Sequence, residues 1–243
     1  MTGGGVGIGE AIARRLAAEG AQLSLLARDL ERLRRVGREL GAHVARCDVR
    51  VRDEVDEAVA AAAALRGPIG GLVAVAGIGG PNGDGADDRF DDLVQTNLAG
   101  TYYTVRAVLR HLSPGPEARH VVVMSSILAR IGVPGYTGYS ASKTGLLGLV
   151  RSFAAELGPR NVHVNAVCPG WVDTDMAWQG LDALAEVIGG SRDDALRQAM
   201  REVPLGRMGQ PEDVAGTVAW LLSDDARGVT GQAIDQNGGA WMG

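Results

Sequence analysis

Tyr139 and Lys143 are the two residues whose types and spacing most directly suggest chemistry. Lys143 is the only lysine, since 23 of the 24 Lys and Arg residues are arginine. A separation of four residues places two side chains on one face of a helix. A nearby ammonium group stabilises a phenolate, so Lys143 is expected to help lower the pKa of Tyr139 from about 10 toward neutrality. The pair is therefore a candidate general acid and base, and the alternative is a solvated helix face.

Three glycines near the start of the chain, Gly3, Gly7 and Gly9, form a second chemical pattern, directly before a helix predicted from Ile8. Glycines let the backbone approach a pyrophosphate closely, and a helix N-terminus favours its negative charge. On their own, three such glycines fit a structural turn equally well. A strand normally precedes a loop of this kind, and none does here. Either the start has been misassigned or trimmed, or the sheet is built without this strand.

The elements that must position these residues alternate between short apolar runs and helical patterns. Strands are predicted over 21–26, 42–46, 72–76, 120–124, 162–167 and 232–235, and helices over 8–19, 29–40, 53–65, 88–112, 139–157 and 211–223. Such alternation is typical of βαβ units. The expected fold is α/β: a single doubly wound Rossmann-type domain over residues 1–243, with a parallel sheet that lacks the usual first strand. Residues 173–207 form a long insertion with weak helical periodicity.

Composition narrows the class of protein. The 243 residues are 46% apolar and 22% charged, which suits one globular domain. A net charge of −5 with both signs interspersed argues against nucleic-acid binding. No segment is apolar enough to span a membrane, and the N-terminus lacks a signal-peptide pattern, so we expect a cytoplasmic protein. Cys47 and Cys168 have neither the spacing of a zinc site nor that of a disulfide framework, so no metal is expected.

Six segments, in order, resemble motifs of the short-chain dehydrogenase/reductase family, and the resemblance covers nearly the whole chain. They are Thr2-Gly3-x-x-x-Gly7-x-Gly9, Asp48-Val49, Asn97, Ser126, Tyr139-x-x-x-Lys143, and Pro169-Gly170 with Thr174. The segment from Pro204 to Pro211 resembles that of ketoacyl and polyketide reductases. One motif departs from the family, because Val75-Ala76-Gly77 stands where Asn-Ala-Gly is usual.

The resemblance implies an oxidoreductase that interconverts a ketone and a secondary alcohol. Tyr139 would be the general acid/base, and Lys143 would hold the nicotinamide ribose and, with the positive oxidised nicotinamide, stabilise the phenolate. Ser126 would hydrogen-bond the substrate oxygen, with Ser125 as its rival for that role. Asn97 would anchor a water molecule that links Lys143 to solvent. The alternatives are a turn-capping serine and a mid-helix asparagine that bonds local backbone.

The resemblance also implies a cofactor site. Its expected residues are Gly3, Gly7, Ile8, Arg28, Asp48, Val49, Ala76, Gly77, Tyr139, Lys143, Pro169, Gly170 and Thr174. Relatives that prefer NAD usually carry an acid where this chain has Ala27, and Arg28 follows. An arginine pairs with the 2′-phosphate of NADP, so NADP(H) is expected rather than NAD(H). Asp29 next to Arg28 and the uncharged Val6 weaken this expectation, and the alternative is an ordinary exposed arginine.

The substrate pocket is expected in the loops at the carboxyl ends of the strands. Its candidate residues are Ile127, Leu128, Tyr136, Trp171, Met176 and Trp178, and the insertion over 173–207 would form a lid. This apolar set predicts an apolar or cyclic ketone. Alternatively, the two tryptophans pack the lid onto the body.

Two other functions remain open from the sequence: a cofactor-binding sensor or scaffold without turnover, and an NAD-dependent hydroxyacyl or alcohol dehydrogenase of the same family. The resemblance further implies a homotetramer or homodimer built through the helices predicted over 88–112 and 139–157. Small residues on them, Ala99, Gly100, Gly145 and Gly148, would permit close helix approach.

Overall fold

Every strand pairing in the structure is parallel. The computed structural model describes residues 1–243. Four strands pair in chain order: β3 (Gly71–Ala74), β4 (Arg119–Met124), β5 (Val162–Pro169) and β6 (Ala233–Gln236). Two further strands, β1 (Ser24–Ala27) and β2 (His43–Arg46), pair with each other. The predicted α/β fold with a parallel sheet is confirmed.

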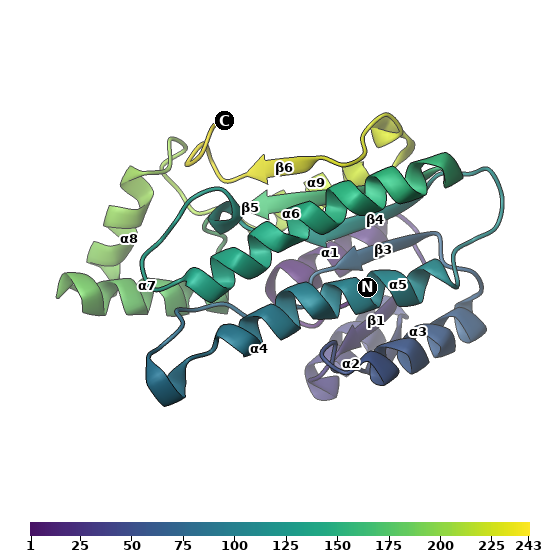
Figure 1. Cartoon of the computed structure of the whole chain (residues 1–243), viewed down its shortest axis with the longest axis horizontal. Helices are drawn as coiled ribbons and strands as arrows, with labels where there is room; N and C mark the ends of the chain where they lie inside the picture. Colours follow the sequence, from purple (N-terminus) through teal and green to yellow (C-terminus); the bar gives the residue numbers. More distant parts are fainter.

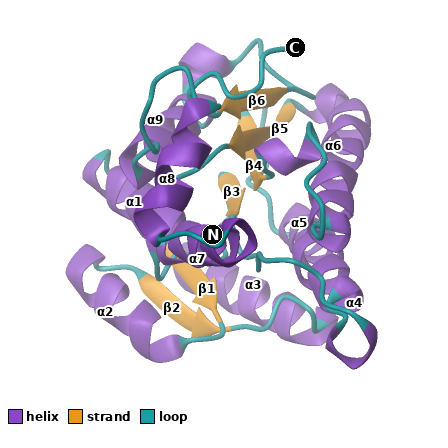
Figure 2. Cartoon of the chain, turned by 90° about the vertical axis from the view of Figure 1, so that its left-hand side faces the viewer, coloured by secondary structure: helices purple, strands orange, loops and turns teal.

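Thr2 is the only residue that joins the two groups of strands. It forms parallel bridges to Leu26 of β1 and Ala74 of β3. Its N–H donates to the Val73 carbonyl at 3.1 Å, while the Val75 N–H donates to the Thr2 carbonyl at 3.3 Å. Figure 2 shows the N-terminus between β1 and β3. No strand is assigned before the first helix within residues 1–243, and Thr2 joins the sheet only through these isolated bridges.

A cavity of about 630 Å³ lies beside Met1 and Thr2, between β1 and β3. Its lining includes Ser24 and Leu26 from β1, and Gly71 and Val73 from β3. Side-by-side strands in a sheet lie about 5 Å apart, whereas β1 and β3 are joined only through Thr2, so space for the cavity remains between the two strand edges.

Helices cover both faces of the sheet (Figure 1). On one face, α3 (Arg52–Arg66), α5 (Gly100–Leu109) and α6 (Thr137–Leu157) form the larger apolar core with β3, β4 and β5. On the other face, α1 (Gly7–Ala18) and α9 (Pro211–Leu221) form a second core. The remaining helix, α2 (Leu30–Leu40), packs on β1 and β2. None of the helices is both long and apolar enough to cross a bilayer.

The helix predicted over 88–112 is unbroken, but it is shorter at both ends and one segment of it is π-helical. The structure has α4 (Phe90–Val94), then a π-helical segment over Gln95–Ala99, then α5. Asp88 lies before the helix because its carboxylate accepts the Phe90 N–H at 2.9 Å, which is a local turn. A π-helical segment adds a residue to one turn and changes the direction of the side chains around it, which helical periodicity in a sequence does not reveal.

The insertion over 173–207 contains two helices, α7 (Asp175–Ile188) and α8 (Arg192–Arg201). Thr174 caps α7, and Ser191 forms a capping box with Asp194 at the start of α8. The carboxyl ends of β5 and β6 point toward the side of the molecule where α7 and α8 lie (Figure 1). The insertion therefore lies near the carboxyl ends of these strands, where the substrate pocket is expected.

Candidate active site

Tyr139 and Lys143 lie in the first turns of α6, which begins at Thr137. Lys143 is buried, and its Nζ donates a hydrogen bond of 2.9 Å to the Met124 carbonyl at the end of β4. The same Nζ lies 5.6 Å from the centroid of the Tyr139 ring. Burial lowers the pKa of Lys143 to about 8. The predicted helical spacing thus brings the two side chains together beside the sheet.

The two candidate serines at the end of β4 face different ways. Ser126 Oγ accepts the Leu128 N–H at 3.1 Å. It also lies close enough to the Tyr139 phenol to act to lower the pKa of that group. Ser125 Oγ instead donates to the Lys143 carbonyl at 2.9 Å inside the core. Ser126 therefore lies beside Tyr139, whereas the Ser125 hydroxyl is hydrogen-bonded to the backbone of α6.

The protein's own groups raise the pKa of Tyr139. Burial of the phenol is the largest cause, and the Ser126 hydroxyl offsets only part of it. This differs in sign from the lowering expected from Lys143. A phenol that is desolvated in this way needs a further positive charge nearby before it ionises near neutral pH.

Asn97 lies in the π-helical segment and is fully buried. Its Oδ1 accepts the Ile78 N–H at 2.9 Å, and its Nδ2 donates to the Ile78 carbonyl at 3.0 Å and to Ser142 Oγ at 3.0 Å. The side chain thus bonds to the loop after β3 and to α6, whereas the alternative of a local helix contact is not seen. The prediction did not include Ser142, although its place three residues after Tyr139 puts it on the same helix face.

The glycine loop packs directly on other backbone atoms. Gly3 has a φ of 72°, and a Cβ there would lie 2.7 Å from the Ala76 nitrogen. A Cβ on Gly9 would lie 1.9 Å from the Gly3 carbonyl oxygen. No side chain caps the N-terminus of α1 at Val6, so its first N–H groups stay open to an anion. A loop this tight before an uncapped helix fits a pyrophosphate group.

Gly77 lies next to Asn97 and Lys143. A Cβ on Gly77 would lie 2.9 Å from Asn97 Oδ1 and 3.4 Å from Lys143 Nζ. The neighbouring Ala76 donates its N–H to Thr2 Oγ1 at 3.3 Å. The end of β3 therefore borders the glycine loop on one side and Lys143 on the other.

Arg28 follows β1, is exposed and forms no ion pair with any other residue. Asp29 does not compete for it, because the Asp29 carboxylate caps α2 through the Arg32 N–H at 3.0 Å and pairs with the Arg32 guanidinium at 3.2 Å. Asp48, after β2, is buried, and hydrogen bonds from Arg50 hold the pKa of its carboxyl below the usual range. A free guanidinium and a neutralised carboxylate together suit a phosphate-bearing nucleotide.

The segment after β5 closes over the glycine loop. The Gly170 N–H donates to the Gln236 carbonyl at 3.1 Å, which continues the β5 and β6 pairing beyond Pro169. Thr174 then turns toward Gly7: a Cβ on that glycine would lie 3.1 Å from the Thr174 methyl. The segment from Gly170 to Thr174 thus faces the glycine loop near the start of the chain.

The six predicted substrate-pocket residues divide into two groups. Trp171 and Trp178 pack on the small apolar core formed by α7 and α8, and the Trp178 indole donates to the Asp173 carboxylate at 2.7 Å. By contrast, Met176 is 46% exposed. Its Sδ lies near Gly79 in the loop after β3, at 2.9 Å from where a Cβ on that glycine would be. Both tryptophans therefore contact the segment over 173–207 itself.

Of the remaining three, Ile127 is buried, while Leu128 and Tyr136 are half-buried. Tyr136 immediately precedes α6 and lies close enough to Tyr139 to act, after burial, to raise the pKa of the Tyr139 phenol. Leu128, Tyr136 and Met176 therefore keep part of their side-chain surface exposed.

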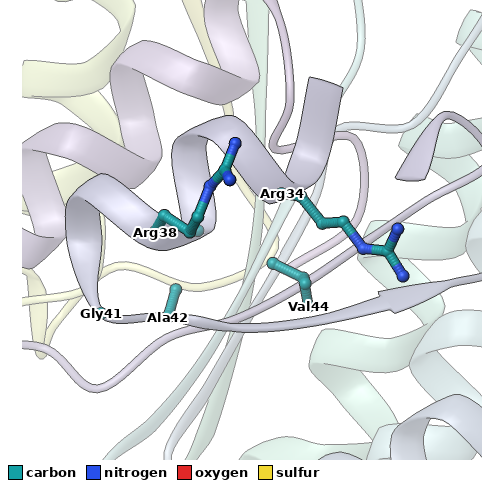
Figure 3. A pocket seen from close by; sticks show the side chains of 6 residues that line it. Arg34, Arg38, Gly41, Ala42 and Val44 are labelled. Atoms are coloured by element: carbon teal, nitrogen blue, oxygen red, sulfur yellow. The ribbon is translucent and has the colours of Figure 1, made fainter. Parts of the chain in front are cut away.

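A shallow hollow of about 370 Å³ lies elsewhere, between α2 and β2 (Figure 3). Its lining includes Arg34, Arg38 and Val44, and the two guanidinium groups point in different directions (Figure 3). None of the predicted site residues contributes to it. The chemistry therefore concentrates at the carboxyl ends of the strands and not in this hollow.

Comparisons with known proteins agree with this geometry. A family model described as enoyl-(acyl carrier protein) reductase matches residues 4–240. The short-chain reductase protein NovJ of Streptomyces niveus is 38% identical over 252 residues, which cover 98% of this chain and 92% of NovJ. The 3-oxoacyl-(acyl-carrier-protein) reductase MabA of Mycobacterium tuberculosis is 33% identical over 249 residues, covering 100% of this chain and 92% of MabA. A crystal structure of a variant actinorhodin polyketide ketoreductase with NADPH has a TM-score of 0.92 at 36% identity, covering 99% of this chain and 95% of that one.

Proposed function

Because the chain belongs to the short-chain dehydrogenase/reductase family, we propose that it reduces a ketone to a secondary alcohol with NADPH, using Tyr139 as the proton donor. The observation that carries this proposal is the convergence of Tyr139, Lys143 and Ser126 at the carboxyl end of β4. A carbonyl that accepts hydride needs a proton donor at its developing alkoxide, and a phenol positioned by these groups can supply it.

Each residue then has a distinct role. The Ser126 hydroxyl, next to the phenol, donates a hydrogen bond to the substrate oxygen and sets its distance from Tyr139. Lys143, held on the Met124 carbonyl, keeps a positive charge near the phenol and stabilises the phenolate that remains after proton transfer. Asn97 holds the loop after β3 against α6 through both of its amide atoms. In the reverse direction the same phenolate accepts the alcohol proton.

The cofactor NADP(H) supplies the hydride, and the residues present fit it. Gly3, Gly7 and Ile8 would hold the pyrophosphate at the start of α1, since a side chain at Gly3 would collide with Ala76. Arg28 would bind the 2′-phosphate. The expected NADP(H) dependence agrees with the NADPH in the actinorhodin ketoreductase structure.

Further cofactor contacts are proposed on both sides of this loop. Asp48 and Val49 would contact the adenine, Ala76 and Gly77 the ribose, and Pro169, Gly170 and Thr174 the nicotinamide. Burial supports the first pair, because Asp48 and Val49 are 7% and 6% exposed where β2 ends.

We propose an apolar or cyclic ketone as the substrate, with residues 173–207 as the lid. Leu128, Tyr136 and Met176 support this class, because they add apolar surface and no cationic group near Ser126. A turnover screen that compares cyclic ketones with small keto acids of similar size tests it, and preferred turnover of the keto acids would refute it. Further parts of the proposal are a homodimer or homotetramer and a cytoplasmic location.

The decisive experiment replaces Tyr139 by phenylalanine. We expect Tyr139→Phe to reduce carbonyl reduction at least about 100-fold, while NADPH titrated against tryptophan fluorescence binds as in the wild type. Tyr103→Phe on α5 is the matched control, since it removes a phenol hydroxyl from a ring that packs edge-to-face with Tyr102 and lies under the Arg52 guanidinium. Full activity in Tyr139→Phe would refute the proposed mechanism. NADPH binding without turnover of any carbonyl by the wild type would favour a cofactor-binding protein instead.

A further inference from the structure

Ser142 forms the only side-chain hydrogen bond between Asn97 and α6. Its side chain is completely buried. Its Oγ accepts from Asn97 Nδ2 at 3.0 Å and donates to the Tyr139 carbonyl at 2.8 Å. One hydroxyl therefore joins the π-helical segment to the helical turn that carries Tyr139.

The position of Asn97 is itself fixed by hydrogen bonds. Both of its amide atoms bond to the backbone of Ile78, and the Thr101 hydroxyl donates to its carbonyl at 2.7 Å. Because these bonds anchor Asn97 to the loop after β3 and to α5, its Nδ2 presents a donor in a defined direction. The bond to Ser142 transmits that position to α6.

The bond from Ser142 to the Tyr139 carbonyl acts on the start of α6. A serine hydroxyl that bonds to a carbonyl in the preceding turn competes with the helical N–H and bends the helix slightly. The affected turn begins with Tyr139 and ends at Lys143, whose side chain is fixed on β4. The direction of this turn therefore sets where the phenol stands relative to Ser126 and to Lys143.

We propose that Ser142 is a positioning residue for the proposed reaction: through its bonds to Asn97 and to the Tyr139 carbonyl it holds the phenol in line with Ser126 and Lys143. This inference rests on the proposed function. It adds a residue that touches neither substrate nor cofactor and acts through Tyr139.

The chain offers a matched control in Ser140. It lies in the same turn of α6, and its buried Oγ has no hydrogen-bond partner. Ser140→Ala and Ser142→Ala therefore remove the same atoms from the same helix, but only the second removes the link to Asn97. We expect Ser142→Ala to lower kcat about 10- to 100-fold, because a misplaced catalytic group of this kind costs about that much. KM and NADPH affinity should stay within about twofold, and Ser140→Ala should keep the wild-type kcat.

Two measurements separate positioning from general damage to the fold. First, the double variant Asn97→Ala/Ser142→Ala should lose no more kcat than Asn97→Ala alone, since both changes break one linkage. Second, the apparent pKa of the pH–rate profile should rise in Ser142→Ala and not in Ser140→Ala. Additive losses with an unchanged pH profile would overturn the proposal.

A readout without turnover keeps the inference testable if no substrate is reduced. Ultraviolet difference absorbance follows ionisation of Tyr139 in the NADP⁺ complex, with Tyr139→Phe as the blank. Ser142→Ala should shift this titration to higher pH, and Ser142→Thr, which retains the hydroxyl, should restore most of it. An unshifted titration in Ser142→Ala would overturn the proposal, whereas failed carbonyl reduction by the wild type would overturn the proposed function alone.

Discussion

The Lys143 ammonium lies 5.6 Å from the centre of the Tyr139 ring, one helical turn further along α6. The two side chains meet because a helix brings residues four apart onto one face, but their protonation is decided by burial. Burial lowers the pKa of Lys143 to about 8 and raises that of Tyr139. The lysine alone does not ionise the phenol. An oxidised nicotinamide, which is positively charged, would add the stabilisation that the protein's own groups lack.

Arg28 is expected to select between the two nicotinamide cofactors. Removal of its charge in Arg28→Ala should weaken NADPH binding about 10- to 100-fold, the value of a charge-assisted hydrogen bond to the 2′-phosphate. NADH binding should change less than about twofold, because NADH has no such phosphate. Fluorescence titration of both cofactors measures the two affinities.

Arg32→Ala is the control for this experiment. Arg32 is exposed in the first turn of α2, near Arg28, but it pairs with Asp29. Its removal should leave the preference for NADPH intact. An equal loss of NADPH affinity in both variants would mean that the general positive potential, and not a contact of Arg28, binds the cofactor.

Features that depend on the local spacing of residues could be predicted from the sequence. The six strands, the α6 pair of Tyr139 and Lys143, and the close approach of the glycine loop follow from periodicity and from residues with special backbone freedom. The π-helical segment around Asn97 could not be predicted in this way, because one extra residue in a helical turn cannot be recognised in the apolar pattern of a sequence. Nor could the choice between Ser125 and Ser126, which depends on the direction in which β4 ends. The packing of Trp171 and Trp178 could not be predicted either, since apolar residues suit the core between two helices and a substrate pocket equally well.

Gly77 is expected to tolerate no side chain. In Gly77→Ala the new Cβ would lie 2.9 Å from Asn97 Oδ1, so the hydrogen bond from Ile78 to that oxygen would be displaced. We expect a loss of about 1–3 kcal/mol in the free energy of unfolding, as for other overpacked sites, together with weaker NADPH binding. Urea unfolding measures the first effect. Gly70→Ala, which precedes β3 and has no atom within 4 Å of its new Cβ, should change stability by less than about 0.5 kcal/mol.

Gly148 tests the expected homo-oligomer. Among the small residues proposed for that interface, Gly145 already packs on Leu98 and Gly100 on Val49 within the chain, whereas a Cβ on Gly148 would meet no atom within 4 Å. If two copies pack through α6, Gly148→Gln should dissociate them toward the 25.2 kDa mass of one chain. Light scattering at micromolar concentration measures this. Ala60→Gln, on the exposed side of α3, should leave the assembly intact, and a monomeric wild type would contradict the proposal.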